Sequence, residues 1–219
     1  MSATPAGTRK RMRLAGVRAP KPLLDPETER RLSARQLEIL DDLQDEVRSE
    51  EFARLTMAEI AARMGCSLRT LYGISPSKEE LILTIVDRRL RRIGRKAIEA
   101  LDESMSPLAA LRAYLRAAHV AVQPESVAFS SSLAHLPGAG RLLDSHADYV
   151  VAVTRSLLDR ALAAGEIVDI DTAAVAHVLG GLGREFSRPD LAEIATRSPK
   201  ETADDIADVI LRGLAAGGA

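Results

Sequence analysis

The chain has 219 residues, of which 46% are hydrophobic and 28% charged, and its formal net charge is −1. A chain of this length and composition buries a hydrophobic core without disulfide or metal support, so disorder of the whole chain is excluded. The single cysteine, Cys66, excludes a disulfide framework and any metal site built from several cysteines. No segment has the ~20 apolar residues of a membrane-spanning helix, so we expect no membrane partner.

The N-terminal segment differs in charge from the rest of the chain. Residues 1–22 contain six basic residues and no acidic one, which leaves a net charge of about −7 for the remainder. Prolines recur through residues 1–30 without helical periodicity, which predicts a basic, flexible arm. The basic residues are not followed by the apolar segment of a secretory signal, so we expect a cytoplasmic protein. Such an arm favours an anionic partner, although a tail that only aids solubility has the same composition. If the partner is DNA, the contact residues of the arm are Arg9, Lys10, Arg11 and Arg13.

After the arm, nearly the whole chain has helical periodicity and strand signals are absent, so the predicted fold class is all-α with about nine helices. Capping boxes, in which a Ser or Thr and a Glu three residues later bind free backbone amides, open helices at Thr56, Ser77 and Ser198. Gly65 and the Ser75-Pro76 pair end two others. The expected helices cover residues 33–48, 56–64, 68–74, 77–100, 106–122, 124–136, 141–164, 171–186 and 198–215.

Residues 56–74 are predicted to form two helices joined by a three-residue turn, with Ile60, Met64 and Leu71 facing a shared core. The second helix has only about seven residues and would not be stable alone, so its neighbours must hold it in place. This is the helix-turn-helix arrangement, in which the second helix enters the major groove of DNA. Because other small helical corners have the same spacing, the spacing alone leaves DNA binding open.

Four short motifs follow one another from residue 55 to residue 81: Leu-Thr-Met-Ala-Glu-Ile-Ala, Gly-Cys-Ser, Thr-Leu-Tyr and Pro-Ser-Lys-Glu-Glu-Leu. Together they resemble the signature of TetR-family transcriptional regulators. The resemblance covers about residues 33–86, whereas residues 107–219 carry no family motif. It implies an N-terminal three-helix helix-turn-helix DNA-binding domain over residues 31–80 and a C-terminal helical ligand-binding and dimerisation domain over residues 81–219.

The same resemblance implies roles for individual residues in DNA binding. Arg69 is the best candidate for reading a base, because arginine can bind O6 and N7 of guanine together. Leu68 stands where the family often has a polar base-contacting residue, so it either contacts a thymine methyl group or packs inward. The implied contacts to phosphate or to the groove are Thr56, Ser67, Thr70, Tyr72 and Lys78.

The chain departs from the family pattern at residues 73–75. Gly73, Ile74 and Ser75 replace bulk and hydrogen-bonding groups, including an aromatic residue that family members usually have at position 75. We expect Ile74 to fill the core in place of the missing ring. The departure puts the operator contacts in question.

The last two predicted helices carry long apolar faces that one chain has few elements left to cover. Pairing them with the same helices of a second copy would make a four-helix bundle, which the resemblance also implies, and Gly180, Gly181 and Gly183 would let the backbones approach closely. The expected dimer residues are Val178, Gly181, Leu182, Ile206 and Ile210. An unknown small-molecule ligand, apolar or amphipathic, is expected between the preceding helices, near Tyr114, Phe129, His146 and Tyr149.

Signals of catalysis are absent. There is no nucleophile elbow, no pair of histidines has the spacing of metal ligands, and the glycine-rich run at 180–183 follows no strand, so we predict no enzyme, cofactor or metal.

The sequence leaves two hypotheses for the function. One hypothesis is a homodimeric DNA-binding regulator, a repressor released from double-stranded operator DNA by its ligand. The other is a helical small-molecule-binding protein or enzyme whose head no longer binds DNA. Residues 73–75 and the acidic residues of the first predicted helix, Asp41, Asp42, Asp45 and Glu46, motivate the second.

Overall fold

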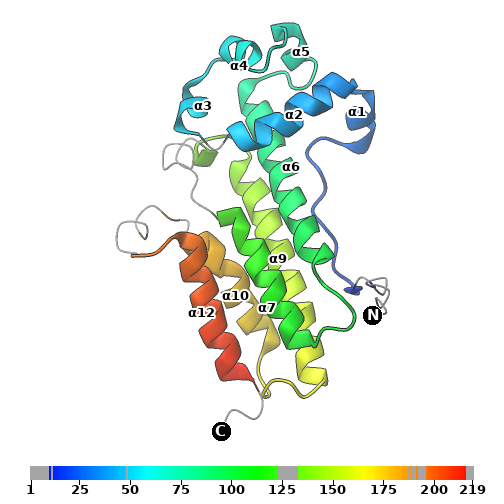
Figure 1. Cartoon of the computed structure of the whole chain (residues 1–219), viewed down its shortest axis with the longest axis vertical. Helices are drawn as coiled ribbons and strands as arrows, with labels where there is room; N and C mark the ends of the chain where they lie inside the picture. The colour runs from blue at the N-terminus through cyan, green and yellow to red at the C-terminus, as the bar shows by residue number, and fades with distance from the viewer. Residues whose placement is uncertain are drawn as a thin grey trace, which may run out of the picture.

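The computed structural model describes residues 10, 12–47, 49–122, 133–186, 188, 191 and 196–215, and all regular elements in these ranges are helices. Figure 1 shows a head of short helices at one end of an elongated helical body. The long helix α6 (Lys78–Glu99) begins in the head and continues into the body. The predicted all-α fold class is confirmed. In the described ranges no helix is long and apolar enough to cross a membrane.

The head consists of short helices that begin at side-chain caps. They are α1 (Pro26–Arg31), α2 (Ala34–Glu46), α3 (Glu50–Arg54), α4 (Met57–Arg63) and α5 (Leu68–Tyr72). The sequence analysis missed α1 and α3, although Asp25 before Pro26 and Ser49 before α3 both occupy the N-cap position that such residues favour.

A hydrophobic core joins the helices of the head. Leu40 of α2, Ile60 of α4 and Leu71 of α5 are fully buried in it. The first two turns of α6 also belong to this core, with Leu81 and Ile85 fully buried. The core of the head therefore includes residues of α6 after position 80, and α6 contributes to the cores of both head and body.

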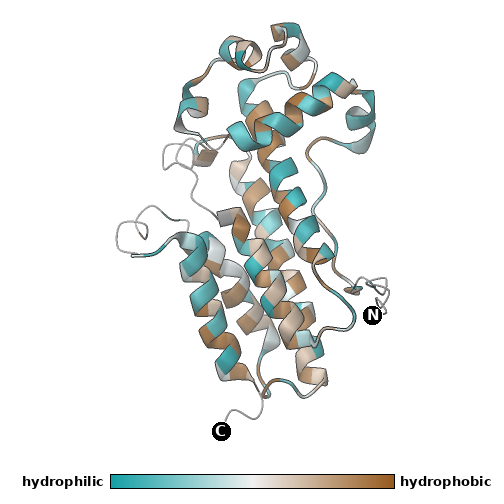
Figure 2. Cartoon of the chain, in the orientation of Figure 1, coloured by the Kyte–Doolittle hydropathy of each residue, from teal (hydrophilic) through white to brown (hydrophobic). Residues whose placement is uncertain are grey.

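The body is a helical bundle that includes the second half of α6. Its further helices are α7 (Pro107–Ala118), the 3-10 helix η1 (His119–Val122), α9 (Ala139–Ala163), α10 (Thr172–Phe186) and α12 (Pro199–Leu214). Figure 2 shows apolar and hydrophilic residues alternating along α12, as expected for a helix with one buried face. The predicted helix over residues 124–136 lies largely outside the described residues.

Gly180 is where α10 and α9 approach each other within one chain. A Cβ atom added to Gly180 would lie 2.7 Å from Cγ2 and 3.1 Å from Cα of Val151 in α9. The expectation that Gly180 serves contact between two chains is therefore wrong. Gly181 differs, because a Cβ atom there would meet nothing within 4 Å.

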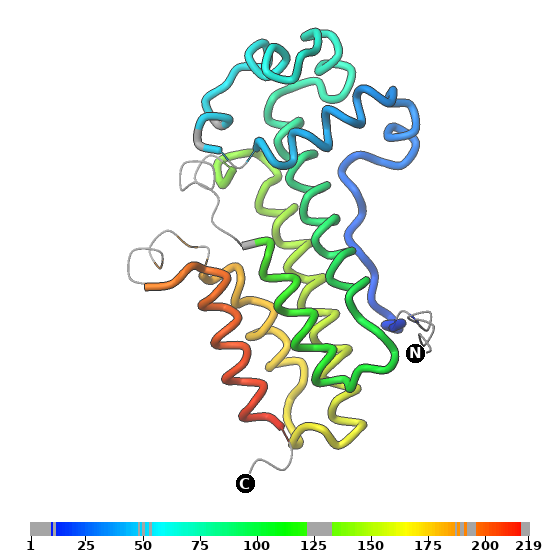
Figure 3. Tube along the Cα trace, in the orientation of Figure 1, coloured from blue at the N-terminus to red at the C-terminus, as the bar shows by residue number. Residues whose placement is uncertain are grey.

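The predicted flexible arm is packed against the body where it is described. Met12 is only 3% exposed in the core of the body, and its amide donates to the Leu101 carbonyl at 3.3 Å. Lys10 pairs through its ammonium with Glu103 at 2.8 Å. Figure 3 shows the segment running beside α6, from the head to the C-terminal end of α6. Buried apolar contacts and backbone hydrogen bonds thus hold the described part of this segment against the body, although its prolines predicted a flexible arm.

Replacing Met12 by alanine is expected to destabilise the protein by about 2–5 kcal/mol, because it leaves a cavity in the body core. The free energy of unfolding from a denaturant titration measures this loss. Arg13→Ala is the matched control, since the Arg13 side chain is exposed one residue away. Equal stability of the Met12→Ala variant and the wild type would mean that the segment is not part of the folded core.

Candidate DNA-binding surface

Helix α5 presents its side chains to solvent on one side and to the core on the other. Its first turn is capped by Ser67, whose hydroxyl accepts the Thr70 amide at 3.0 Å. Arg69 is exposed, while Leu68 and Tyr72 are 40% and 51% exposed. Of the two alternatives for Leu68, packing inward is thus excluded. The outer side of α5 combines a guanidinium group, a phenol and an apolar side chain.

The start of α4 lies near the start of α6. Thr56 and Glu59 form the predicted capping box: the Thr56 amide donates to the Glu59 carboxylate at 2.7 Å, and the Glu59 amide donates to the Thr56 hydroxyl at 3.3 Å. The hydrogen bonds from Thr56 lower the pKa of Glu59, and the positive charge of Lys78 contributes in the same direction. Lys78 therefore lies near enough to act on the first turn of α4. Because a helix N-terminus carries partial positive charge, this corner suits an anion such as a phosphate.

The departure at residues 73–75 leaves the head core closed. Ile74 and Ser75 are both buried, and Ile74 packs in the head core as the sequence predicted. Ser75, at the position where an aromatic residue was expected, therefore lies buried in a closed head.

The acidic side of α2 is paired with arginines of α6. Asp41 lies 3.1 Å from Arg88, and Asp45 lies 3.3 Å from Arg92. Two arginines of the arginine-rich stretch of α6 are therefore ion-paired within the chain. The negative charge of α2 is thus partly neutralised within the chain, which weakens one of the two reasons for a head that does not bind DNA.

The basic residues of the N-terminal segment lie far from α5. In Figure 1 the start of the described N-terminal segment lies beside the end of α6 that is remote from α4 and α5. Lys10 is paired there with Glu103, and the Arg13 carbonyl accepts from Arg160 at 3.4 Å. The structure therefore does not bring Lys10 and Arg13 to the surface formed by α5. Arg9 and Arg11 lie outside the described residues.

The four residues expected to contact a ligand are in four different situations. Tyr114 is fully buried, its hydroxyl has no hydrogen-bond partner, and burial raises its pKa well above the ordinary value. Tyr149 is half-buried against α6, where a Cβ atom on Gly94 would lie 3.5 Å from its ring. His146 is hydrogen-bonded to buried Asp87 at 2.9 Å, and Phe129 lies outside the described residues. Within the described ranges, no group of three His, Cys, Asp or Glu residues could hold a metal ion.

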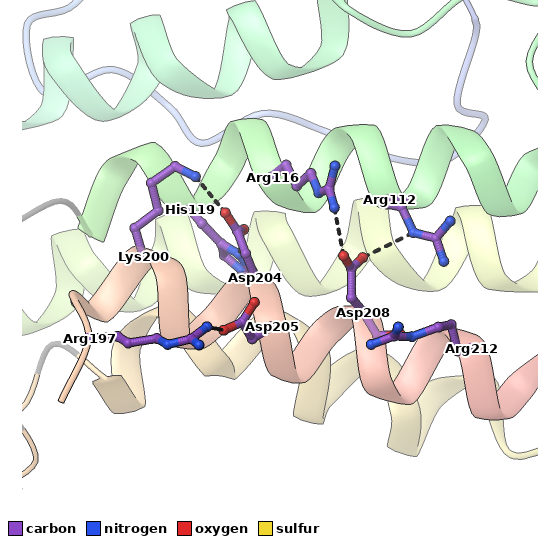
Figure 4. Close-up of polar contacts among 9 residues, drawn as sticks. All are labelled: Arg112, Arg116, His119, Arg197, Lys200, Asp204, Asp205, Asp208 and Arg212. Atoms are coloured by element: carbon purple, nitrogen blue, oxygen red, sulfur yellow. Dashed lines mark hydrogen bonds and ion pairs between the residues drawn. The ribbon is translucent and has the colours of Figure 1, made fainter. Parts of the chain in front are cut away.

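Polar contacts that the sequence analysis did not find join α7 to α12 (Figure 4). Arg112 and Arg116 both pair with Asp208, at 3.0 and 2.6 Å. His119 shares a hydrogen with Asp204 through Nδ1 at 2.7 Å, while its buried Nε2 has no partner. Burial lowers the pKa of His119, although the hydrogen bond to the Asp204 carboxylate acts against this shift.

Because the pKa of His119 is lowered in the folded protein, the free energy of unfolding is predicted to decrease as the pH is lowered. Below about pH 6.5 the unfolded chain binds a proton on this histidine more readily than the folded chain, so unfolding becomes easier as the pH drops towards the folded pKa. The free energy of unfolding is expected to be lower at pH 5.5 than at pH 7.5, with a weaker dependence in the His119→Gln variant. His135→Gln, at an exposed histidine, is the control. The same pH dependence in the His119→Gln variant as in the wild type would contradict this assignment.

The comparison with known proteins supports the fold. No protein-family profile matches the sequence, and no curated protein does. A TetR transcription regulator from Haloarcula marismortui has a similar structure, with a TM-score of 0.69 and 22% identity over 83% of this chain and 98% of that one. A TetR transcriptional regulator from Streptomyces coelicolor has a TM-score of 0.55 and 24% identity over 84% of this chain and 99% of that one. A TetR-family transcriptional regulator from Agrobacterium tumefaciens has a TM-score of 0.64 and 18% identity over 84% of this chain and 98% of that one. The chain therefore has the fold of TetR-family transcriptional regulators.

Proposed function

We propose that this protein is a transcriptional regulator of the TetR type, which binds double-stranded operator DNA as a homodimer. The observation that carries the proposal is the exposed side of α5, where Arg69 and Tyr72 project from a short helix that the head holds by buried Leu71. A short, rigidly held helix with an exposed arginine is suited to entering a major groove.

The proposed contacts divide into two groups. Arg69 reads a base edge, and Ser67, Leu68 and Thr70 line the same turn of α5. Phosphates on either side are bound by Thr56 at the start of α4, Tyr72 at the end of α5 and Lys78 at the start of α6. Phosphate contacts set the register and most of the affinity, whereas base contacts set the sequence preference.

The proposed dimer interface is formed by α10 and α12. Val178 on α10 is 53% exposed and Val209 on α12 is 62% exposed, and Gly181 lies one turn after Val178 with open space above it. Ile206 and Ile210 are half-buried beside Val209, whereas Leu182 is mostly taken up by the core of its own chain. A two-fold pairing of these helices would cover the apolar residues and present two α5 helices to successive major grooves, about 34 Å apart.

The proposed regulation acts through the body. A ligand bound between α6, α7 and α9, near the buried Tyr114 hydroxyl and Tyr149, would favour one arrangement of the two heads. The population that fits the operator would then fall, which is the behaviour of a repressor released by its ligand. The mainly aliphatic surroundings of Tyr114 favour an apolar or amphipathic ligand.

An electrophoretic mobility shift assay tests the DNA-binding proposal. Purified full-length protein is mixed with the DNA upstream of its own gene, with unrelated DNA of equal length as competitor. We expect a discrete complex that survives a large excess of the competitor at physiological salt. A complex that the unrelated DNA displaces equally well, or no complex at all, would favour the helical ligand-binding protein instead.

A further inference from the structure

Gln36 lies in the first turn of α2, where its side-chain amide joins two helices of the head. Its Oε1 accepts the backbone amide of Ser33 at 2.9 Å, which closes the capping box of α2. Its Nε2 donates to the carbonyl of Thr70 in α5 at 3.3 Å. The two atoms thus have different roles, one at the start of α2 and the other on α5.

The Thr70 carbonyl depends on this contact because the backbone amides that follow it donate elsewhere. The Gly73 amide donates to the Arg69 carbonyl at 3.0 Å. The amides of Ile74 and Ser75 both donate to the Leu71 carbonyl, at 2.9 and 3.0 Å. Carbonyls at a helix end need an outside donor, and for Thr70 the Gln36 amide is that donor.

Gly73 leaves the space that the Gln36 amide occupies. A Cβ atom on Gly73 would lie 2.7 Å from Gln36 Nε2, which is shorter than the distances at which Cβ atoms contact other heavy atoms in proteins. The backbone of Gly73 has ordinary right-handed helical angles, with φ −74° and ψ −15°, so its conformation does not require glycine. The glycine is explained by the neighbouring side chain, which also accounts for part of the departure at residues 73–75.

The residue before Gln36 holds the other helix of the pair. Arg35 donates to the carbonyl of Met64, at the end of α4, at 2.8 Å. Two successive side chains of α2 therefore contact the ends of α4 and α5, in addition to the apolar core that these helices share.

We infer that Gln36 is a positioning residue for α5, which it holds in the orientation needed to read DNA, and that Gly73 is small so that Gln36 can do so. The inference rests on the proposed function, because orientation matters only if α5 enters the groove. A five-residue helix cannot maintain its own direction, so a hydrogen bond near its end affects the reading of bases more than the stability of the head.

Gln36→Glu separates the two roles of the side chain. Glutamate can still accept the Ser33 amide and close the capping box, but its second oxygen faces the Thr70 carbonyl oxygen instead of donating to it. We expect an unchanged thermal midpoint and a loss of about three- to tenfold in affinity for the DNA sequence that the wild type selects, the range for one lost hydrogen bond. Ala34→Glu, exposed in the same turn, controls for the added charge. Equal loss in both variants would overturn the inference.

A double-mutant cycle tests the link between Gln36 and Gly73. Gly73→Ala is expected to lower the affinity for the selected sequence severalfold in the wild type, because the methyl group displaces the amide, but to have no such effect in the Gln36→Ala background. Binding of unrelated DNA should stay constant in all four proteins. If the two losses simply add, Gln36 does not act through the space at Gly73 and the inference fails. If the wild type itself selects no DNA sequence, the proposed function fails first and the inference with it.

Discussion

Replacing Gly181 by leucine is expected to split the homodimer and to abolish operator binding while the single chain stays folded. A Cβ atom at position 181 would meet nothing within 4 Å in its own chain, so we expect the monomer to accommodate leucine, which also favours the helix more than glycine does. In the proposed dimer the same position faces its symmetry mate. The substitution therefore places two leucines, one from each chain, at the closest approach of two helices. Loss of the dimer separates the two heads and removes simultaneous binding to two half-sites.

Light scattering at micromolar concentration measures the oligomeric state, and a mobility shift assay measures operator binding. Gly140→Leu is the matched control, because Gly140 is also a helical glycine at which a Cβ atom would meet nothing within 4 Å, but it lies in the first turn of α9. We expect the control to remain dimeric and to bind DNA. A monomeric wild type, or a Gly181→Leu variant that remains a dimer and binds the operator normally, would contradict the proposed interface.

Replacing Arg69 by alanine is expected to remove the preference for one base pair in each half-site. If the guanidinium binds a guanine through two hydrogen bonds, the discrimination lost is about 1–3 kcal/mol, or roughly 5- to 150-fold. Lys78→Ala should behave differently: it weakens binding to all sequences and reduces the dependence of affinity on salt, because a phosphate contact is lost.

Operator variants changed at one base pair at a time, measured with wild-type and variant proteins, distinguish these two effects. Arg95→Ala is the control for loss of positive charge, since Arg95 is exposed on the part of α6 that belongs to the body. A set of operator variants that Arg69→Ala binds with the same relative affinities as the wild type would show that Arg69 reads no base.

Local sequence signals predicted the longer helices well. The capping boxes at Thr56 and Ser198 and the glycine after α4 fixed helix ends to within two residues, because caps act over three or four positions of the chain. The same kind of signal was present at Asp25 and Ser49, but five- and six-residue helices have no periodicity to support it. Their stability comes from neighbouring elements, which the sequence does not identify.

Tertiary packing decided the features that the sequence could not predict. The prolines of the N-terminal segment indicate irregular backbone correctly, but only the core of the body shows that Met12 is buried. Similarly, three glycines within four residues of α10 look equivalent in the sequence. Gly180 packs on α9 while Gly181 faces open space, a difference that depends on which side of α10 meets the rest of the chain.

Selection of bound fragments from a random DNA library shows whether α5 reads DNA sequence. Full-length protein is incubated with the library at physiological salt, and bound fragments are amplified and sequenced over several rounds. We predict an enriched motif with two-fold symmetry and half-sites about one helical turn apart, in which one position loses its preference when Arg69→Ala protein is used. Enrichment of no motif by the wild type, or of an identical motif by the Arg69→Ala variant, would contradict the account.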